Sequence, residues 1–411
     1  MSTAASGDRN PAADEALAKG TEKGTERRAL GIACSAHALH DGYTDLVWVG
    51  LPIWQAEFGL SYAAVGMLRM IYTGTMASLQ IPSSHIAERF GGGIVLAIGT
   101  ALCGLCYCLA GIGTDVRWLV AALFLGGLGA ATQHPIGSAL VTRVFTGTRA
   151  LTAFGTYNFA GDVGKVLLPA AAGALILFMP WRPAYGLLGL LGLGAAVAIF
   201  VLTPRLPAEG SSKVPARELG SEVHSANLRF GFRILSALGI ADSVVRGAFF
   251  VLLPFLLIGK GATATTAGLA LTLVFVGGAA GKLAFGWVAR WLGMVPTIVV
   301  AQALAAAGML GILLVPLIPA LALLPLVGVT LNGGTTVIYG SVPNYAAPDK
   351  RTHALSVFYT TTIGAAAVSP PLSGLLGDLV GISNAVVVVF VLTLLTIPVA
   401  CLLRNRTVAP N

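Results

Sequence analysis

Residues 30–54 read LGIACSAHALHDGYTDLVWVGLPIW, and this stretch is the most informative part of the chain. As an α-helix it is long enough to cross the roughly 30 Å of hydrocarbon in a bilayer. It nevertheless carries His37, His40, Asp41 and Asp45. A charge at bilayer depth costs about 2.5–3.5 kcal/mol on insertion scales, so such residues usually face a wet cavity or a charged partner. The stretch therefore predicts a membrane helix that lines a polar path.

The composition of the whole chain is that of an integral membrane protein. Of the 411 residues, 56% are hydrophobic and 10% are charged, whereas a soluble domain has about 25% charged residues. The net charge of +8 does not indicate nucleic-acid binding, because the basic residues are spread over short connections instead of forming a stripe with aromatics. Cys103 and Cys106 form a C-x-x-C without the second pair that a zinc site needs. We therefore expect the lipid bilayer as a partner, and neither nucleic acid nor bound metal.

Apolar runs of about 20 residues recur along the chain after a polar start. Only helices or closed barrels satisfy the backbone in lipid, so each run is predicted to be a transmembrane helix. The twelve predicted helices are 30–54, 62–83, 93–113, 117–141, 150–178, 183–203, 231–258, 264–286, 295–316, 319–342, 353–377 and 383–403.

The distribution of Arg and Lys sets the predicted orientation. These residues concentrate in the loops on the side of the N-terminus, and such an excess marks the cytoplasmic side, so both termini are expected in the cytoplasm. The longest internal polar stretch falls midway and indicates a linker between two six-helix bundles. The expected organisation is a disordered cytoplasmic tail 1–28, bundles 29–203 and 230–404, a cytoplasmic linker 204–229, and a cytoplasmic tail 405–411.

The two halves are weakly repeated. Parallel repeats of six helices are one known plan of transporters, with the substrate site near the bilayer midplane between the repeats. Equivalent residues lie 202 positions apart, namely Pro52/Pro254, Gly66/Gly268, Ala87/Ala289 and Gly91/Gly293.

Two motifs carry a resemblance to a known family. The loop Ser84–Gly92 has Glu88, Arg89 and Gly91 where the major facilitator superfamily has its G-x-x-x-D-R-x-G loop. The fifth predicted helix is similar to the antiporter motif of exporters in that superfamily; ordinary packing of small residues in membrane helices is the alternative explanation. The residues that match the antiporter motif are Gly155, Gly164, Pro169 and Gly173.

Within that superfamily, the chain most resembles the fosmidomycin-resistance exporters. The resemblance implies a twelve-helix monomer in a bacterial inner membrane, which rocks its halves around a midplane cavity and uses no cofactor. Asp162 and Lys165 depart from the pattern of those exporters. The shared features are His37-x-x-x-Asp41, His134-Pro135, and Gly161-x-x-Gly164 with Pro169.

The acids of the first helix are candidates for proton coupling. His37, Asp41 and Asp45 are spaced i, i+4, i+8 and share one helix face. Asp41 lies about 11 residues into the helix, or ~16 Å, which is near the midplane. Asp41 and Asp45 can exchange protons there, and His37 and His40 can relay them. The alternative is a static bridge from either acid to Arg69.

Other embedded polar residues are candidates for substrate binding. Arg69 either pairs with the acids or binds an anion through its planar fork. The pairs Asp162/Lys165 and Asp242/Arg246 either form buried ion pairs or direct their bases at a substrate. His134 serves the substrate or a proton, or makes a structural hydrogen bond, and Lys282 is expected to snorkel toward the headgroups. The substrate-binding candidates are Arg69, His134, Asn158, Lys165, Arg246 and Asn332.

The sequence contains no nucleotide-binding, metal-ligand or nucleophile motif, so we do not expect an enzyme. The leading prediction is a proton-coupled secondary transporter that exports a small, anionic organic compound or drug. The first alternative is a proton-symport importer of a carboxylate or phosphonate. The second is a membrane sensor or assembly protein that has the fold and transports nothing.

Overall fold

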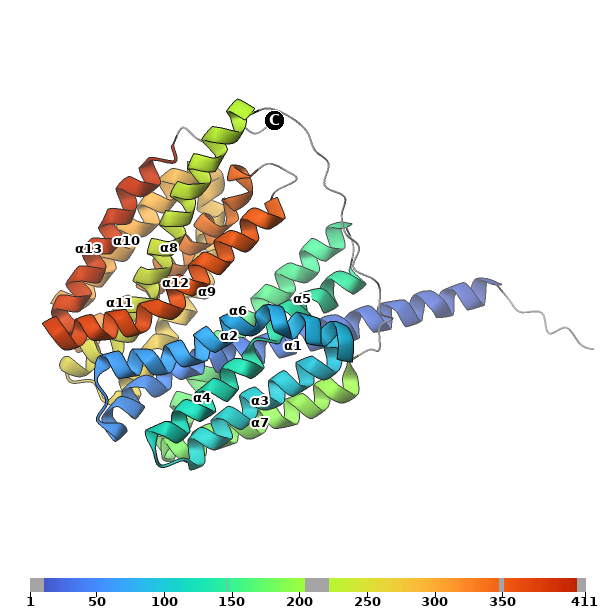
Figure 1. Ribbon diagram of the computed structural model, residues 1–411, viewed down its shortest axis with the longest axis horizontal. Helices are drawn as coiled ribbons and strands as arrows, with labels where there is room; N and C mark the ends of the chain where they lie inside the picture. Colours follow the sequence, from blue (N-terminus) through green and yellow to red (C-terminus); the bar gives the residue numbers. More distant parts are fainter. Residues whose placement is uncertain (1–10, 146, 204–221, 347–350, 405–411) are drawn as a thin grey trace, which may run out of the picture.

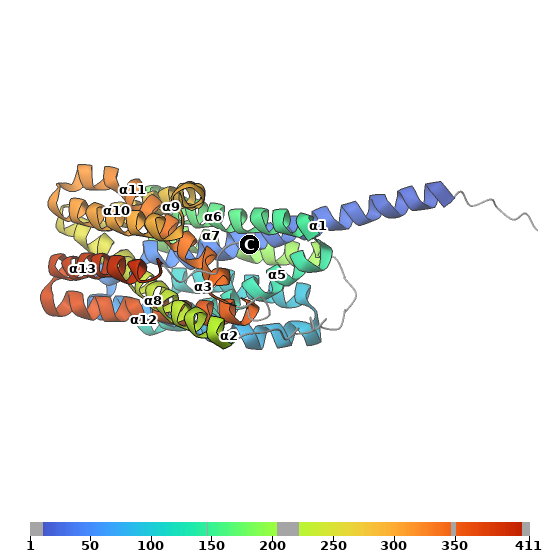
Figure 2. The same ribbon diagram turned by 90° about the horizontal axis from the view of Figure 1, so that it is seen from above.

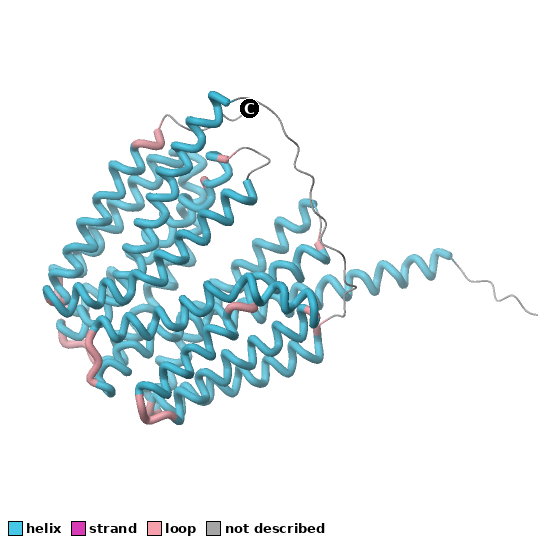
Figure 3. The backbone as a smooth tube through the Cα atoms, in the orientation of Figure 1, coloured by secondary structure: helices cyan, strands magenta, loops and turns pink. Residues whose placement is uncertain are grey.

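The computed structural model describes residues 11–145, 147–203, 222–346 and 351–404, and these residues form helices joined by short turns (Figure 3). All twelve predicted segments are helical, so the all-helical prediction is confirmed. The helices are α1 Pro11–Phe58, α2 Tyr62–Phe90, α3 Gly92–Ile112, α4 Val116–Ala130, α5 Gln133–Val144, α6 Gly147–Phe178, α7 Trp181–Leu202, α8 Glu222–Gly259, α9 Ala264–Leu292, α10 Met294–Leu314, α11 Leu317–Gly340, the 3₁₀ turn η1 Val342–Tyr345, α12 Arg351–Val380 and α13 Ile382–Cys401.

The helices form two bundles that lie side by side. Helices α1–α7 make one bundle and α8–α13 the other, as Figures 1 and 2 show from two directions. Within the described ranges, ten segments are long and apolar enough to cross a membrane, with α4 and α5 counted as one segment, Val116–Val144. Helices α1 and α2 are not among the ten, because polar residues interrupt their apolar runs.

The predicted helix 117–141 is broken between α4 and α5. Pro135 has no N–H, so the carbonyl of Ala131 loses the partner that a continuous helix would provide. The Ser83 hydroxyl of α2 donates to that carbonyl at 2.9 Å. The break therefore follows from one proline, and a neighbouring helix satisfies the exposed backbone.

Residues 1–28 were predicted to be a disordered cytoplasmic tail, and α1 begins within this segment, at Pro11. Its Ala, Glu and Lys residues are strong helix formers, and they extend the helix out of the apolar segment. In the same way, α8 begins at Glu222, inside the predicted linker. Residues 1–10, 204–221 and 405–411 lie outside the described residues, so the predictions for them stay untested.

The repeat in the sequence appears in the structure as equivalent turns. Gly91 ends α2 with φ +93, and its N–H bonds to the Ala87 carbonyl at 2.9 Å. Gly293 ends α9 with φ +80, and its N–H bonds to the Ala289 carbonyl at 3.1 Å. Positive φ favours glycine, because it has no Cβ. These two pairs of repeated residues therefore make the same turn in each bundle.

The bundles touch at the end of the molecule opposite the start of α1 (Figure 1). Gly66 in α2 leaves no room for a side chain against the backbone of Pro370 in α12, and Gly173 in α6 leaves none against Leu269 in α9. Such small residues let helices from different bundles approach closely. The contact at this end positions the polar residues near the middle of the helices around a shared space.

Candidate functional site

A cavity of about 290 Å³ lies between the bundles. It is lined by residues of both bundles, and many of the lining helices occupy equivalent positions in the two repeats. Most of the embedded ionisable groups face it. The ionisable lining residues are Asp41, Asp45, Arg69, His134, Asp162, Lys165, Arg246 and Lys282.

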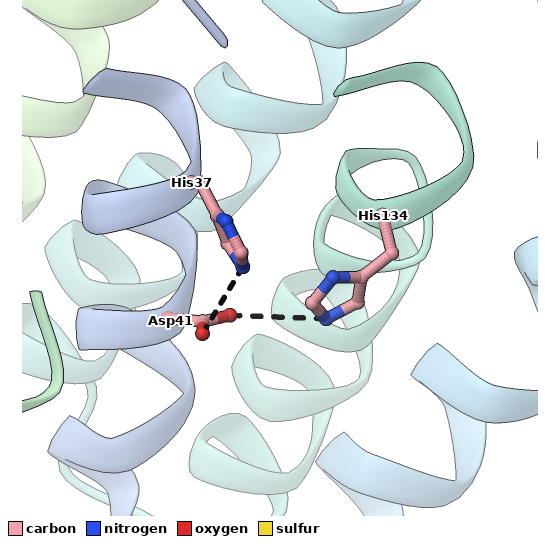
Figure 4. Close-up of side chains that lie close together, drawn as sticks. All are labelled: His37, Asp41 and His134. Atoms are coloured by element: carbon pink, nitrogen blue, oxygen red, sulfur yellow. Dashed lines mark ion pairs between the residues drawn. The ribbon is translucent and has the colours of Figure 1, made fainter. Parts of the chain in front are cut away.

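Asp41 is buried at the wall of this cavity, among three basic side chains. Its carboxylate oxygens lie 3.2 Å from Lys165 Nζ, 3.3 Å from His37 Nε2 and 3.7 Å from His134 Nε2. Figure 4 shows the two imidazoles directed at the carboxylate from α1 and α5. Gly161 of α6 makes room for this group, because a Cβ there would collide with His37 and Asp41.

The hydrogen bonds of His37 define where it can hold protons. Its Nδ1 lies 2.9 Å from the Tyr157 carbonyl oxygen. A carbonyl only accepts, so Nδ1 carries a proton and Nε2 is left to face Asp41. A second proton on Nε2 makes the ring an imidazolium that bonds to the carboxylate. His37 Nε2 and the Asp41 carboxylate therefore face each other directly, 3.3 Å apart.

The same residues have the spacing of a metal site. The donor atoms of His37, Asp41 and His134 all lie within 4.8 Å of one another. We expected no metal site, because the sequence contains no metal-ligand motif. In the structure, Lys165 places its ammonium group 3.2 Å from the Asp41 carboxylate, and this positive charge disfavours a metal cation at the same oxygen.

Arg69 lines the cavity and contacts three residues of α1. Its guanidinium lies 3.8 Å from Asp45 Oδ1 and 4.2 Å from the centre of the Trp48 ring, and it donates to the Thr44 carbonyl. The bridge between Arg69 and an acid of the first helix, one of the two predicted alternatives, is present for Asp45.

The predicted ion pair between Asp162 and Lys165 is not formed among the described residues. Lys165 pairs with Asp41 instead, and Asp162 pairs with Lys282 of the other bundle. The reason is helix packing: Gly164 lies against the backbone of Ala38, which brings α6 onto α1. Lys282 was expected to snorkel to the headgroups, but it lines the cavity and joins α9 to α6.

The predicted pair Asp242/Arg246 is also replaced by other contacts. The buried Asp242 carboxylate accepts hydrogen bonds from Gln302 Nε2 at 3.0 Å and Thr335 Oγ1 at 2.7 Å. Arg246 lines the cavity, and within the part of the chain that the structure describes no hydrogen bond or ion pair involves it. The Arg246 guanidinium is thus not neutralised by Asp242 through an ion pair, contrary to one of the two predicted alternatives.

His40 is turned away from the cavity, although it was grouped with the proton carriers. Its Nε2 lies 2.8 Å from Thr100 Oγ1 in α3, and its Nδ1 lies 3.7 Å from Cys103 Sγ. The contact has a counterpart in the other bundle: Asp242 and Gln302 lie 202 residues after His40 and Thr100. His40 is thus part of a repeated structural contact between the first and third membrane segments.

Of the two asparagines predicted to bind substrate, one lines the cavity and the other does not. Asn332 lines the cavity, and its Nδ2 donates to the Gly328 carbonyl at 3.2 Å. Asn158 is exposed and does not line the cavity. In the loop motif, Glu88 and Arg89 are exposed, and Arg89 lies over the Phe90 ring at 5.5 Å.

The antiporter-like residues of α6 have separate roles in packing. Gly164 contacts α1 within its own bundle, Gly173 contacts α9 of the other bundle, and nothing lies close to Gly155. Pro169 lies inside α6. Two of the three glycines therefore allow close helix contact.

Sequence reasoning missed the aromatic residues of the cavity. Trp48, Phe250 and Phe275 are buried and line it. The rings of Trp48 and Phe250 meet edge to face, with 5.7 Å between their centres. The sequence did contain an indication of this pair, because Trp48 and Phe250 are also 202 residues apart and therefore occupy equivalent positions in the repeat.

The sequence of this chain matches a known protein family. A sequence model of the Major Facilitator Superfamily matches residues 33–328 and 235–411. The cephamycin export protein CmcT of Amycolatopsis lactamdurans is 27% identical over 227 residues, which cover 54% of this chain and 45% of that protein. The probable L-galactonate transporter of Escherichia coli (strain K12) is 25% identical over 146 residues, which cover 36% of this chain and 32% of that protein. The matched region thus spans less than half of each of these relatives.

A solved structure has the same fold. It is the inward-facing, occupied conformation of a bacterial homolog of the human lysosomal transporter Spinster. The TM-score is 0.80 at 15% sequence identity, over 94% of this chain and 99% of that one.

Proposed function

Because this chain belongs to the Major Facilitator Superfamily of membrane transporters, we propose that it is a proton-coupled exporter of a small, anionic organic compound. The observation that carries the proposal is the Asp41 carboxylate at the cavity wall, 3.2 Å from Lys165 Nζ and within reach of two imidazoles. The coupling follows from competition for one carboxylate. A proton on Asp41 removes its negative charge and weakens its hold on Lys165. The charge that the cavity wall presents to a substrate anion therefore depends on whether Asp41 carries a proton.

Proton and substrate states would be linked through two ion pairs. Lys165–Asp41 lies within one bundle, whereas Lys282–Asp162 joins α9 to α6 across the cavity. An anion that attracts Lys282 weakens the contact between bundles. Rocking of the bundles around the cavity, as expected for parallel six-helix repeats, would then expose it to the other side.

The proposed topology has twelve crossings, with both termini on the cytoplasmic face of a bacterial inner membrane. The proposed topology adds α1 and α2 to the ten segments that composition identifies. Their composition is too polar to identify them as crossings by itself. The bundles touch at the end away from the termini. In this topology that end is external, and the cavity belongs to an inward-facing state of a monomer.

Export is favoured by the antiporter-like residues of α6, by the resemblance to fosmidomycin-resistance exporters, and by the name of one relative, a cephamycin export protein. Import by proton symport is the second candidate. It is favoured by the similarity to the probable L-galactonate transporter, because galactonate is the anion of an organic acid.

The proposal is tested in two steps. A deletion strain is first screened for sensitivity to organic acids and antimetabolites. The compound that is found is then loaded into oriented proteoliposomes with a pH-sensitive dye. Opposite proton and substrate fluxes support export, and parallel fluxes support import.

Variants test the role of Asp41 in those fluxes. Asp41→Asn is expected to abolish proton movement, whereas Asp115→Asn, which alters an exposed acid in a turn, is expected to leave it intact. Substrate flux without any proton flux, or an unchanged Asp41→Asn variant, would refute the proposal.

A further inference from the structure

Helices α1 and α8 present matching rows of residues to the cavity. Each of these helices opens a bundle, and their lining residues recur 202 positions apart. The rows differ in chemistry. The α1 row carries two carboxylates, whereas the α8 row carries a hydroxyl and a guanidinium. The equivalent lining residues are Asp41/Ser243, Thr44/Arg246, Asp45/Gly247 and Trp48/Phe250.

Among the described lining residues, the permanent cations outnumber the carboxylates by one. Three cations have a carboxylate partner, in the pairs Arg69–Asp45, Lys165–Asp41 and Lys282–Asp162. Among the described lining residues, Arg246 alone is a permanent cation without such a partner. A ligand with one negative charge would balance the cavity.

Two hydroxyl groups of the cavity wall lack hydrogen-bond partners among the described residues. Ser243 lies three residues before Arg246, on the same face of α8. Its side chain is fully buried in the cavity wall, and its Oγ has no partner. The Thr73 hydroxyl of α2, in the wall of the same cavity, is likewise buried and unpaired. Buried polar groups are normally paired, and a carboxylate can accept from both a guanidinium and a hydroxyl.

Three aromatic rings continue from this polar group along the cavity wall. Phe250 lies one turn after Arg246 and Gly247 on α8. Its ring meets those of Trp48 and Phe275 edge to face, at 5.7 and 5.5 Å between centres. Each of the three side chains is more than 90% buried. Aromatic rings prefer such edge-to-face or offset contacts, so a flat ring is the ligand group that this wall fits.

Building on the proposed function, we propose that the substrate is a monocarboxylate that carries an aromatic ring. Its carboxylate binds the Arg246 guanidinium, with the Ser243 hydroxyl as a further donor. Its ring lies against Phe250 and Phe275. Arg69 takes no part in binding the carboxylate, because Asp45 and Trp48 already occupy its guanidinium.

Calorimetric binding to the purified full chain in detergent tests this assignment, without any proton gradient. The probes are 3-phenylpropionate, hexanoate, which has the same charge and no ring, and 3-phenylpropionamide, which has the ring and no charge. Hexanoate is expected to bind roughly five- to tenfold more weakly than 3-phenylpropionate, the size of one aromatic contact. The amide is expected to bind about tenfold more weakly or worse, because it lacks the charge-assisted bond.

Variants assign each preference to its residue. Phe250→Leu should remove the preference for the ring and keep the preference for charge. Arg246→Gln should remove the preference for charge, and Arg246→Lys should restore part of it, because lysine keeps the charge without the planar fork. Arg290→Gln, which removes an exposed cation outside the cavity, is the matched control. Elution profiles and unfolding temperatures without ligand show that each variant is folded.

The result that overturns the inference is equal affinity for hexanoate and 3-phenylpropionate, absence of binding by 3-phenylpropionate, or an unchanged charge preference in Arg246→Gln. A preference for phthalate over benzoate would overturn the assignment of a single charge. These outcomes are separate from the proposed function. Binding without proton-linked flux refutes only the coupling, and proton-linked flux of a non-aromatic compound refutes only the substrate class.

Discussion

The carboxylate of Asp378, in the second bundle, accepts hydrogen bonds from the backbone N–H groups of Tyr62 and Ala63, at 2.9 and 2.8 Å. These two residues begin α2 in the first bundle. The N–H groups at the start of a helix have no partner within it, and a carboxylate there also interacts favourably with the helix dipole. Asp378 therefore caps a helix of the opposite bundle. The cap can exist only while the bundles touch at this end.

Removing this cap is expected to favour the state in which that end is open. A helix N-cap is worth about 1 kcal/mol, so Asp378→Ala should change the ratio of the two states roughly fivefold. Spin labels at Ile112 and Ile318, which are exposed near the contact end of each bundle, report the change. The distance distribution should gain a longer component in the variant.

A cap within one bundle provides the control for this measurement. Asp115 accepts from the Arg117 N–H at 2.7 Å at the start of α4, and hydrogen bonds from Arg117 hold the pKa of the Asp115 carboxyl below its usual range. Asp115→Ala should leave the distance distribution unchanged. If both variants, or neither, lengthen the distance, the cap of Asp378 does not stabilise this state.

The pairing of Lys165 with Asp41 predicts energetic coupling between these two residues. Each single variant, Asp41→Asn or Lys165→Gln, leaves one charge at the cavity wall without its partner in this pair. The double variant removes both, so its loss of stability should be smaller than the sum by about 0.5–3 kcal/mol. Unfolding in detergent measures the three variants. The same cycle on Asp162 and Lys165 should show weaker coupling, and a stronger one would contradict the observed pairing.

The two histidines of α1 are expected to differ in proton-driven flux. His37 faces Asp41, whereas His40 faces Thr100 away from the cavity. His37→Gln should lower the flux about tenfold or more, since it removes a group that transfers protons. His40→Gln keeps a hydrogen-bonding side chain beside Thr100 and should retain the flux. Proteoliposomes with the transported compound give both values, and an equal loss in two folded variants would argue against this division.

Two glycines of α6 should respond oppositely to substitution by alanine. Gly164 leaves no space against Ala38, so Gly164→Ala should destabilise the protein by about 1–3 kcal/mol through overpacking. Gly155 is exposed and has nothing close to it, so Gly155→Ala should stabilise the helix by up to about 1 kcal/mol. Unfolding temperatures in detergent decide this. A tolerated Gly164→Ala would mean that α6 does not lie so close to α1.

The local pattern of the chain was enough to locate the helices. Apolar runs of membrane length, bounded by residues such as Gly91 and Gly293, give the positions of the helices and many of their approximate ends, because backbone hydrogen bonding in lipid permits few alternatives. The offset of 202 residues gave the two-fold plan. It also contained the match of Trp48 to Phe250, which becomes meaningful only when both side chains face one cavity.

Which charge meets which partner depended on the packing of separate helices. Spacing along a helix tells which residues share a face, as for Asp162 and Lys165, but not which neighbour that face will meet. The close approach of α6 to α1 at Gly164 turns Lys165 to Asp41, and the approach of α9 leaves Asp162 to Lys282. Arg246 stays without an acid for the same reason, since Asp242 is satisfied by Gln302 and Thr335. Distances between helices, which a one-dimensional pattern does not contain, therefore set the chemistry of the cavity.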